Sequence, residues 1–188
     1  TRMQSSRPKM LQTVGGRPML MHLLDTAISM NPAQVHVVVG SGAEQVMEAC
    51  KGYRVTWVHQ AERRGTGHAV MAAMPGIPDE AAVLVLLGDH PLIPVALLSE
   101  LAVEENLPLA LLTMELDDPA GYGRILRDPG GNIIGVIEHH DAAPHQHEIK
   151  EVNTGIIMVD STRLRGWAYS SFWPASVCRW WWLISVSM

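Results

Sequence analysis

The sequence has little of what would link it to a membrane, a nucleic acid or an oxidising compartment. It contains only two cysteines, Cys50 and Cys178, whose spacing fits neither a metal site nor a redox pair, so a reduced, cytoplasmic location is expected. No apolar run approaches the roughly 20 residues of a membrane-spanning helix, and no secretory signal is present. Acidic residues outnumber basic ones by 19 to 14, which argues against a nucleic-acid-binding surface. We therefore expect neither a membrane nor a nucleic acid among its partners.

The central feature of the sequence is the apolar run 83–87, which ends in Gly88-Asp89-His90-Pro91. Apolar residues without alternation indicate a strand buried on both faces. Ligands of open α/β sheets bind at the carboxyl ends of the strands, so Asp89 is expected at the mouth of the sheet, where Gly88 lets a ligand approach closely. A carboxylate there suits a divalent metal bound to phosphate oxygens. The alternative is a turn that merely ends the strand.

Strand-like and helix-like segments alternate along the first 114 residues of the 188-residue chain. Buried-type apolar runs are separated by segments whose apolar residues recur at helical spacing. This alternation, with short connections, predicts one α/β domain with a doubly wound, largely parallel sheet. The expected strands are 11–14, 35–40, 55–60, 83–87 and 109–114, and the expected helices are 19–29, 43–50, 69–74 and 94–105.

Three polar segments are candidates for binding a phosphate or a base. Gly65 and Thr66 open a helix, whose first N–H groups attract an anion, although many helices begin this way without binding anything. Gln60 ends the preceding strand, where its amide would read a base edge or cap a turn. Arg2 and Lys9 lie in a basic, Ser- and Pro-containing start that would neutralise phosphates. The alternative for that start is a solvated, frayed terminus.

The pattern changes after residue 114. A hairpin is expected around residues 128–132, followed by a polar segment and another strand at 151–159. Gly123, Glu138 and Asn153 would supply a backbone donor, a carboxylate and an amide, which suit the hydroxyl and amide groups of a sugar. Four histidines fall between His139 and His147, and we interpret them as part of a solvated loop rather than a zinc site, because no helix or strand spaces them as ligands.

Taken together, several motifs resemble the uridylyltransferase half of the bifunctional bacterial N-acetylglucosamine-1-phosphate uridylyltransferase/glucosamine-1-phosphate acetyltransferases, within the sugar nucleotidyltransferase superfamily. Each motif is modest alone, but their order and spacing from Thr1 to about Gly166 are specific. The matching elements are Thr1-Arg2-Met3, Pro8-Lys9, Gln60-Ala61-Glu62, Gly65-Thr66-Gly67-His68-Ala69, Gly88-Asp89-x-Pro91-Leu92, Asp117-Asp118-Pro119-x-Gly121-Tyr122-Gly123-Arg124-Ile125, Glu138-His139-x-Asp141-Ala142 and Glu151-Val152-Asn153-Thr154-Gly155.

The resemblance implies a Rossmann-like, three-layer nucleotidyltransferase fold and a set of residue roles. It implies uridylyl transfer from UTP to N-acetylglucosamine 1-phosphate, giving UDP-N-acetylglucosamine and pyrophosphate for cell-envelope synthesis. Arg2 and Lys9 would then be catalytic, holding the phosphates, and Asp89 would bind Mg²⁺. The remaining substrate-binding positions are Gln60, Gly65 and Thr66 around uracil and ribose, Gly88 beside the metal, and Gly123, Glu138 and Asn153 around the sugar.

The chain also departs from the family's pattern. The family has a first strand and a glycine-rich loop before the motif that begins here at Thr1, and its second metal ligand, an asparagine, has no counterpart. Five of the six tryptophans lie after Gly166, where Arg179 is the sole charged residue. We therefore expect a partial nucleotidyltransferase domain at 1–166 and an aberrant tail at 167–188; a membrane-interface anchor is the alternative for the tail.

These departures shape the functional expectations. The resemblance implies a homotrimer formed through an acetyltransferase domain, but the hexapeptide repeats of that domain are absent here. We expect this 188-residue chain to have little or no turnover. The alternatives are a molybdenum-cofactor guanylyl- or cytidylyltransferase, and a non-catalytic remnant that binds a nucleotide sugar.

Overall fold

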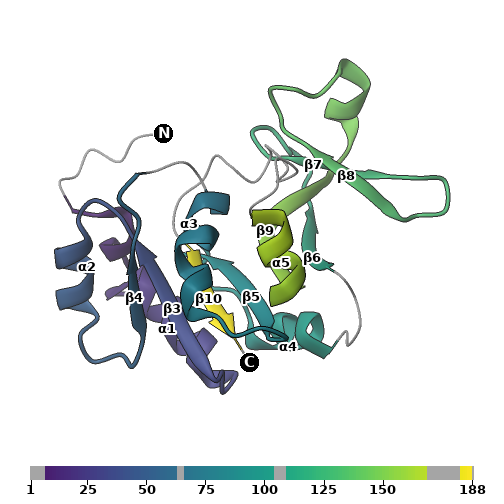
Figure 1. Cartoon of the computed structure of the whole chain (residues 1–188). Helices are drawn as coiled ribbons and strands as arrows, with labels where there is room; N and C mark the ends of the chain where they lie inside the picture. Colours follow the sequence, from purple (N-terminus) through teal and green to yellow (C-terminus); the bar gives the residue numbers. More distant parts are fainter. Residues whose placement is uncertain (1–6, 63–65, 104–108, 169–182, 188) are drawn as a thin grey trace.

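A computed structural model describes residues 7–62, 66–103, 109–168 and 183–187 of the chain (Figure 1). An eight-stranded sheet has the order β4-β3-β10-β5-β9-β7-β8, and β6 pairs with β9 beside this path. Its strands are β3 (Gln34–Val39), β4 (Thr56–His59), β5 (Ala82–Leu87), β6 (Leu109–Glu115), β7 (Arg124–Arg127), β8 (Ile133–Ile137), β9 (Glu151–Asp160) and β10 (Leu183–Ser187). A small hairpin of β1 (Thr13–Val14) and β2 (Arg17–Pro18) stands apart.

The helices lie on both faces of the sheet, so the domain has three layers (Figure 1). They are α1 (Met19–Ser29), α2 (Ala43–Ala49), α3 (Thr66–Ala73), α4 (Val95–Val103) and α5 (Ser161–Ala168), with short 3₁₀ turns η1 (Lys9–Leu11), η2 (Met74–Gly76) and η3 (Pro144–Glu148). None of the helices within the described ranges has both the length and the apolar character needed to cross a bilayer. The predicted alternation of strands and helices is confirmed from residue 19 to residue 114. The strand expected at 11–14 is wrong as a member of the sheet, because Leu11 ends η1 and Thr13–Val14 pair only with Arg17–Pro18 in the separate hairpin.

Two hydrophobic clusters explain why β5 has no polar face. Leu84 and Leu86 point into the cluster formed with α1, α2 and α4. Val83 and Val85 point into the opposite cluster, formed with α3, η2 and α5. Because both faces of the strand are covered, every residue from Val83 to Leu87 is buried, as the unbroken apolar run predicts.

The sheet is more mixed than the predicted, largely parallel one. Among the described strands, β3 and β4 form the sole parallel pair. The strands β3, β4, β5 and β6 point in one direction, but β10 runs antiparallel between β3 and β5, and β9 runs antiparallel between β5 and β6. Helical connections therefore give the four strands a common direction without making them all neighbours.

The expected boundary between residues 166 and 167 stays a prediction. Helix α5 continues through Gly166 to Ala168. Strand β10, which belongs to the expected tail, occupies the slot between β3 and β5 in the centre of the sheet (Figure 1). This part of the tail therefore shares the sheet of the first 166 residues.

The hairpin of β7 and β8 extends away from the helical layers (Figure 1). Its turn closes with Gly131 in the left-handed region, at a φ of 84°, as expected for the Asp128-Pro129-Gly130-Gly131-Asn132 segment. Arg127 donates to both carboxylate oxygens of Glu151, over 2.8 and 2.7 Å. These hydrogen bonds from the guanidinium lower the pKa of Glu151 and tie the hairpin to the start of β9.

His36 is an unusual buried polar residue on β3. Its side chain is fully buried, and neither ring nitrogen has a hydrogen-bond partner among the described residues. A Cβ on Gly76 of η2 would lie 2.7 Å from the ring carbon Cε1, so glycine is needed there to let the chain pack against the imidazole. Burial lowers the pKa of His36, because the charged form would lose its hydration without gaining a partner.

The lowered pKa makes His36 a source of acid sensitivity. Since the folded state binds fewer protons than the unfolded state below about pH 6.5, the stability present above that pH is lost as the pH falls through the folded pKa. We expect the free energy of unfolding to fall less between pH 7.5 and pH 5.5 in His36→Leu than in the parent, as measured by urea denaturation. The same substitution at His59, an exposed residue of β4, is the control; an equal effect there would contradict this assignment.

Candidate functional site

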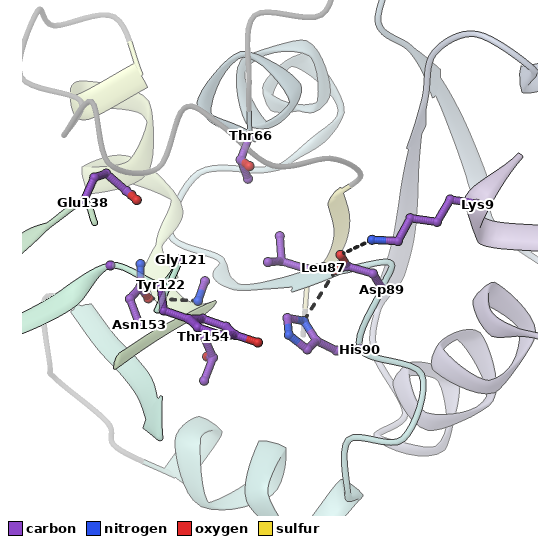
Figure 2. A pocket seen from close by; sticks show the side chains of 12 residues that line it. Lys9, Thr66, Leu87, Asp89, His90, Gly121, Tyr122, Glu138, Asn153 and Thr154 are labelled. Carbon is purple, nitrogen blue, oxygen red and sulfur yellow. Dashed lines mark hydrogen bonds and ion pairs between the residues drawn. The ribbon is translucent and has the colours of Figure 1, made fainter. Parts of the chain in front are cut away.

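A cavity of about 300 Å³ opens where β5 ends, between the helical part of the domain and the β7–β8 hairpin (Figure 2). Residues from six separate segments line it, so it exists only in the folded chain. The lining residues are Lys9, Thr66, Leu87, Asp89, His90, Gly121, Tyr122, Gly123, Glu138, Asn153, Thr154 and Gly155.

Lys9 and Asp89 form an ion pair on one wall of this cavity. β5 ends at Leu87, and the following turn brings Asp89 out of the sheet. The Lys9 ammonium, in η1, lies 2.7 Å from Asp89 Oδ2, although the two residues are 80 positions apart. Their side chains are 42% and 24% exposed, so water screens the pair and its contribution to stability is small. Both charges therefore remain accessible to a ligand.

Glu138 and Asn153 lie on the wall opposite Lys9 and Asp89 (Figure 2). The carbonyl oxygen of Gly123 accepts a 2.9 Å hydrogen bond from the backbone N–H of Asn153, which fixes the loop before β7 against β9. A Cβ at Gly123 would lie 3.5 Å from Glu138 Oε1 and 3.1 Å from Val136. The absence of a side chain at Gly123 thus keeps the approach to the Glu138 carboxylate open.

A bulge in β9 aims its residues at the cavity. Leu111 of β6 pairs with Ile157, and Thr113 pairs with Asn153, so three residues of β9 stand opposite the single residue Leu112. Such bulges bend a strand and redirect side chains, often beside binding sites. The extra residues of β9 include Thr154 and Gly155, which line the cavity.

Side-chain hydrogen bonds replace the interrupted ladder at this bulge. Asn153 Oδ1 accepts the N–H of Gly155 over 2.8 Å, and Thr154 Oγ1 donates to the carbonyl of Leu112 over 2.6 Å. Gly155 has a φ of 77°, and a Cβ there would lie 2.6 Å from Leu87 Cδ1. Glycine is therefore required both for its backbone conformation and for its contact with the end of β5.

Arg124 supports the same wall from beneath. It is 1% exposed and donates from Nη1 to the carbonyl oxygen of Tyr122, while its Nη2 lies 3.3 Å from His139 Nδ1. The rings of His140 and His147 pack edge-on against His139. Burial lowers the pKa of His139, and the nearby His147 and Arg124 lower it further. This cluster thus ties the Tyr122 loop to the segment that carries Glu138.

The histidine cluster does not form a metal site in the described part of the chain. No group of three His, Cys, Asp or Glu residues there has a geometry that could hold an ion. The interpretation of the histidines between His139 and His147 as part of a solvated loop stays a prediction. Asp89 supplies a single carboxylate at the cavity, which fits a cation held mainly by substrate oxygens and water rather than by a complete protein cage.

Most of the predicted site residues meet at the cavity. Lys9, Thr66, Asp89, Gly123, Glu138 and Asn153 line it, and Gly88 lies between two lining residues. Gln60 is not among the lining residues; its Nε2 is 2.9 Å from His68 Nδ1. Arg2 and Gly65 lie outside the described residues. The roles of these residues stay predictions.

The sequence predictions did not single out several residues of the cavity wall. Tyr122, Thr154 and Gly155 stand inside motifs that were recognised, so their adjacency to predicted site residues was an available signal. His90 follows Asp89 directly, and its Nδ1 lies 3.8 Å from Asp89 Oδ1. Leu87 offered no signal, because its place in an apolar strand is explained by burial alone.

Comparisons with known proteins show the family to which the chain belongs. The family model described as "MobA-like NTP transferase domain" matches residues 1–112. The bifunctional protein GlmU of Halorhodospira halophila is 48% identical over 167 residues, covering 89% of this chain and 35% of that protein. GlmU of Alkalilimnicola ehrlichii is 50% identical over 167 residues, covering 89% and 36%. The chain thus spans about a third of the length of these relatives, and the likeness predicted from the motifs is confirmed.

Solved structures agree on the fold. A Bacillus anthracis protein described as a glucose-1-phosphate thymidylyltransferase superposes with a TM-score of 0.70 at 18% identity, covering 92% of this chain and 70% of that one. A CMP:2-keto-3-deoxy-manno-octonic acid synthetase superposes with a TM-score of 0.65 at 17% identity, covering 91% and 76%. At such identities the likeness concerns the fold, and the Rossmann-like nucleotidyltransferase fold is confirmed. With its family model matching more than half of its length, the chain belongs to the MobA-like NTP transferase domain family and is a nucleotidyltransferase domain.

Proposed function

We propose that the cavity serves uridylyl transfer from UTP to N-acetylglucosamine 1-phosphate, which yields UDP-N-acetylglucosamine and pyrophosphate for bacterial cell-envelope synthesis. One observation carries the proposal: a cation and an acidic residue, Lys9 and Asp89, face a wall suited to a polar sugar across one cavity. Bifunctional GlmU proteins, which match 89% of this chain, support the choice of sugar and nucleotide.

The chemistry needs no nucleophile from the protein. An oxygen of the sugar phosphate attacks the α-phosphorus of UTP; a new phosphorus–oxygen bond forms, and the bond to the β-phosphate oxygen breaks. Pyrophosphate leaves with that electron pair. The attacking phosphate is already an anion, so no strong base is required. The task of Lys9, and of Arg2 in the same role, is to neutralise phosphate charge and align the reacting groups.

A divalent cation is a general feature of nucleotidyl transfer, and we propose Mg²⁺ held in part by Asp89. When bound, Mg²⁺ supplies charge neutralisation on the phosphate oxygens and so favours the departure of pyrophosphate. Asp89 fits this role because its carboxylate faces the cavity and is partly exposed. Lys9 would turn from Asp89 to the phosphates when the nucleotide binds.

The opposite wall fits an N-acetylated sugar. The carboxylate of Glu138 can accept hydrogen bonds from sugar hydroxyls, and the side-chain amide of Asn153 is held in place by its bond to Gly155. Gly123 presents backbone close to Glu138, so a sugar ring can reach both groups. Thr66, at the start of α3, together with Gly65 and Gln60, is proposed to surround the uracil and ribose.

Calorimetric titration of the 188-residue chain tests the nucleotide and sugar preference. We expect UDP-N-acetylglucosamine to bind more tightly than UDP, and UTP to bind more tightly than GTP or CTP. A preference for GTP or CTP would instead favour a guanylyl- or cytidylyltransferase of the molybdenum-cofactor type. A pyrophosphate-release assay with UTP and N-acetylglucosamine 1-phosphate then separates a catalytic domain from one that binds the nucleotide sugar without turnover.

Replacing Glu138 by Gln tests the sugar wall. We expect Glu138→Gln to weaken UDP-N-acetylglucosamine binding about tenfold or more, because a hydrogen bond to a charged group contributes roughly 1.5–3 kcal/mol. The affinity for UTP should change less than about twofold, because Lys9 and Asp89 lie on the other wall (Figure 2). Titration calorimetry measures both affinities.

The matched control is Glu148→Gln, the same substitution at an exposed residue of η3 outside the cavity lining. We expect this variant to bind both ligands as the parent does. An equal loss of UTP and UDP-N-acetylglucosamine affinity in Glu138→Gln would remove Glu138 from the sugar site.

A further inference from the structure

His90 completes the surroundings of the Asp89 carboxylate. Oδ2 of Asp89 accepts from Lys9 over 2.7 Å, whereas Oδ1 faces Nδ1 of His90 at 3.8 Å (Figure 2). That separation is too long for a hydrogen bond. Nδ1 is nevertheless buried and has no hydrogen-bond partner among the described residues. Each carboxylate oxygen of Asp89 thus faces one nitrogen atom: Lys9 Nζ is hydrogen-bonded to Oδ2, and His90 Nδ1 lies near Oδ1 without a hydrogen bond.

The geometry favours the tautomer of His90 in which Nδ1 carries a proton. A carboxylate oxygen only accepts hydrogen bonds, so an imidazole nitrogen facing it is attracted when it carries a proton and repelled when it presents a lone pair. The backbone N–H of His90 bonds to the carbonyl of Leu87 over 3.1 Å, which fixes the backbone of His90 in the turn that follows β5. A small rotation of either side chain would bring Nδ1–H and Oδ1 into hydrogen-bond contact.

Binding of a polyphosphate would remove Lys9 as the ion-pair partner of Asp89. Lys9 is 42% exposed and carries the positive charge nearest to Asp89, so a ligand with several negative charges draws it away from a single carboxylate. Asp89 then loses the partner that restrained Oδ2 and is free to rotate about its last side-chain bond. His90 remains beside Oδ1 as a donor.

We propose that His90 is a positioning residue, whose Nδ1–H holds Oδ1 of Asp89 so that Oδ2 stays directed at a divalent cation after Lys9 has moved to the phosphates. The inference rests on the proposed cation-binding role of Asp89. It assigns to His90 the outer contact that commonly orients a metal-binding side chain, whose loss typically weakens metal affinity 10- to 100-fold.

Binding of Mn²⁺ to the full chain in the presence of UTP and without sugar phosphate, followed by electron paramagnetic resonance, tests the inference without turnover, because the phosphates supply the oxygens that a single carboxylate lacks. The background is the unsubstituted chain, in which UTP draws Lys9 away from Asp89. We expect His90→Leu and His90→Ala, which remove the donor, to raise the Mn²⁺ dissociation constant about tenfold or more. His90→Asn, whose side-chain amide can donate from nearly the position of Nδ1, should stay within about threefold of the background.

The controls distinguish the cation-binding role of Asp89 from the positioning role of His90. Loss of Mn²⁺ binding in Asp89→Asn is expected; a background chain that binds no Mn²⁺, or an Asp89→Asn variant that binds it unchanged, would overturn the cation-binding role of Asp89 itself. If Asp89 proves necessary but His90→Leu and His90→Ala bind Mn²⁺ as the background does, the positioning role of His90 is wrong. Equal weakening in His90→Asn, with an unchanged thermal unfolding midpoint, would also overturn it, because a donor at that position would then not suffice.

Discussion

The candidate site depends on the mismatch in length between β6 and β9. Between two paired positions, β9 has three residues where β6 has Leu112 alone, and the surplus must bulge out of the ladder. Thr154, Gly155 and Ile156 make up this stretch. The side chains of Asn153 and Thr154 hold it, by accepting from the N–H groups of Gly155 and Ile156 and by donating from Thr154 to the carbonyl of Leu112. Because β9 also pairs with β5 and β7, the bulge brings the end of β5, with Asp89 behind it, into one cavity with the hairpin that precedes Glu138.

Glycine makes this arrangement possible at two positions. Gly155 adopts a left-handed conformation and leaves room for Leu87, and Gly123 leaves room beside Glu138. Each glycine lets backbone approach where a side chain would collide. The buried Arg124 supports the same region, since it links the carbonyl of Tyr122 to His139. The polar wall of the cavity is thus held by packing and hydrogen bonds beneath it.

The local spacing of apolar residues was sufficient to predict many of the strands and helices. The run 83–87 predicts a strand covered on both faces, and the structure places its side chains in two separate clusters. The helical periodicity of residues 19–29 predicts α1 with the bounds that it has. These features follow from short-range spacing, which the sequence displays directly. The direction of β9 and β10 between other strands depends on long-range pairing, which no local pattern records.

The candidate site was predictable where a residue's chemistry stands out at the end of a strand. Asp89 and Asn153 are polar residues next to apolar runs, and the structure brings both to the cavity. The bulge was not predictable, because it depends on how many residues of β6 stand opposite β9. The partnership of Lys9 with Asp89 joins positions 80 residues apart, and the motifs suggested only that both residues handle phosphate.

The ion pair between Lys9 and Asp89 also sets a threshold for ligand charge. Any anion that recruits the ammonium must first compete with a carboxylate that already holds it at 2.7 Å. The attraction between Lys9 and a singly charged anion is little stronger than the attraction between Lys9 and Asp89. Replacing Asp89 by such an anion therefore changes the free energy little. A ligand that carries several negative charges attracts Lys9 more strongly than Asp89 does. A ligand that arrives with its own cation also gives Asp89 a new partner of opposite charge. Because water screens the resting pair, this bias is modest, and it favours polyanions over small monovalent anions.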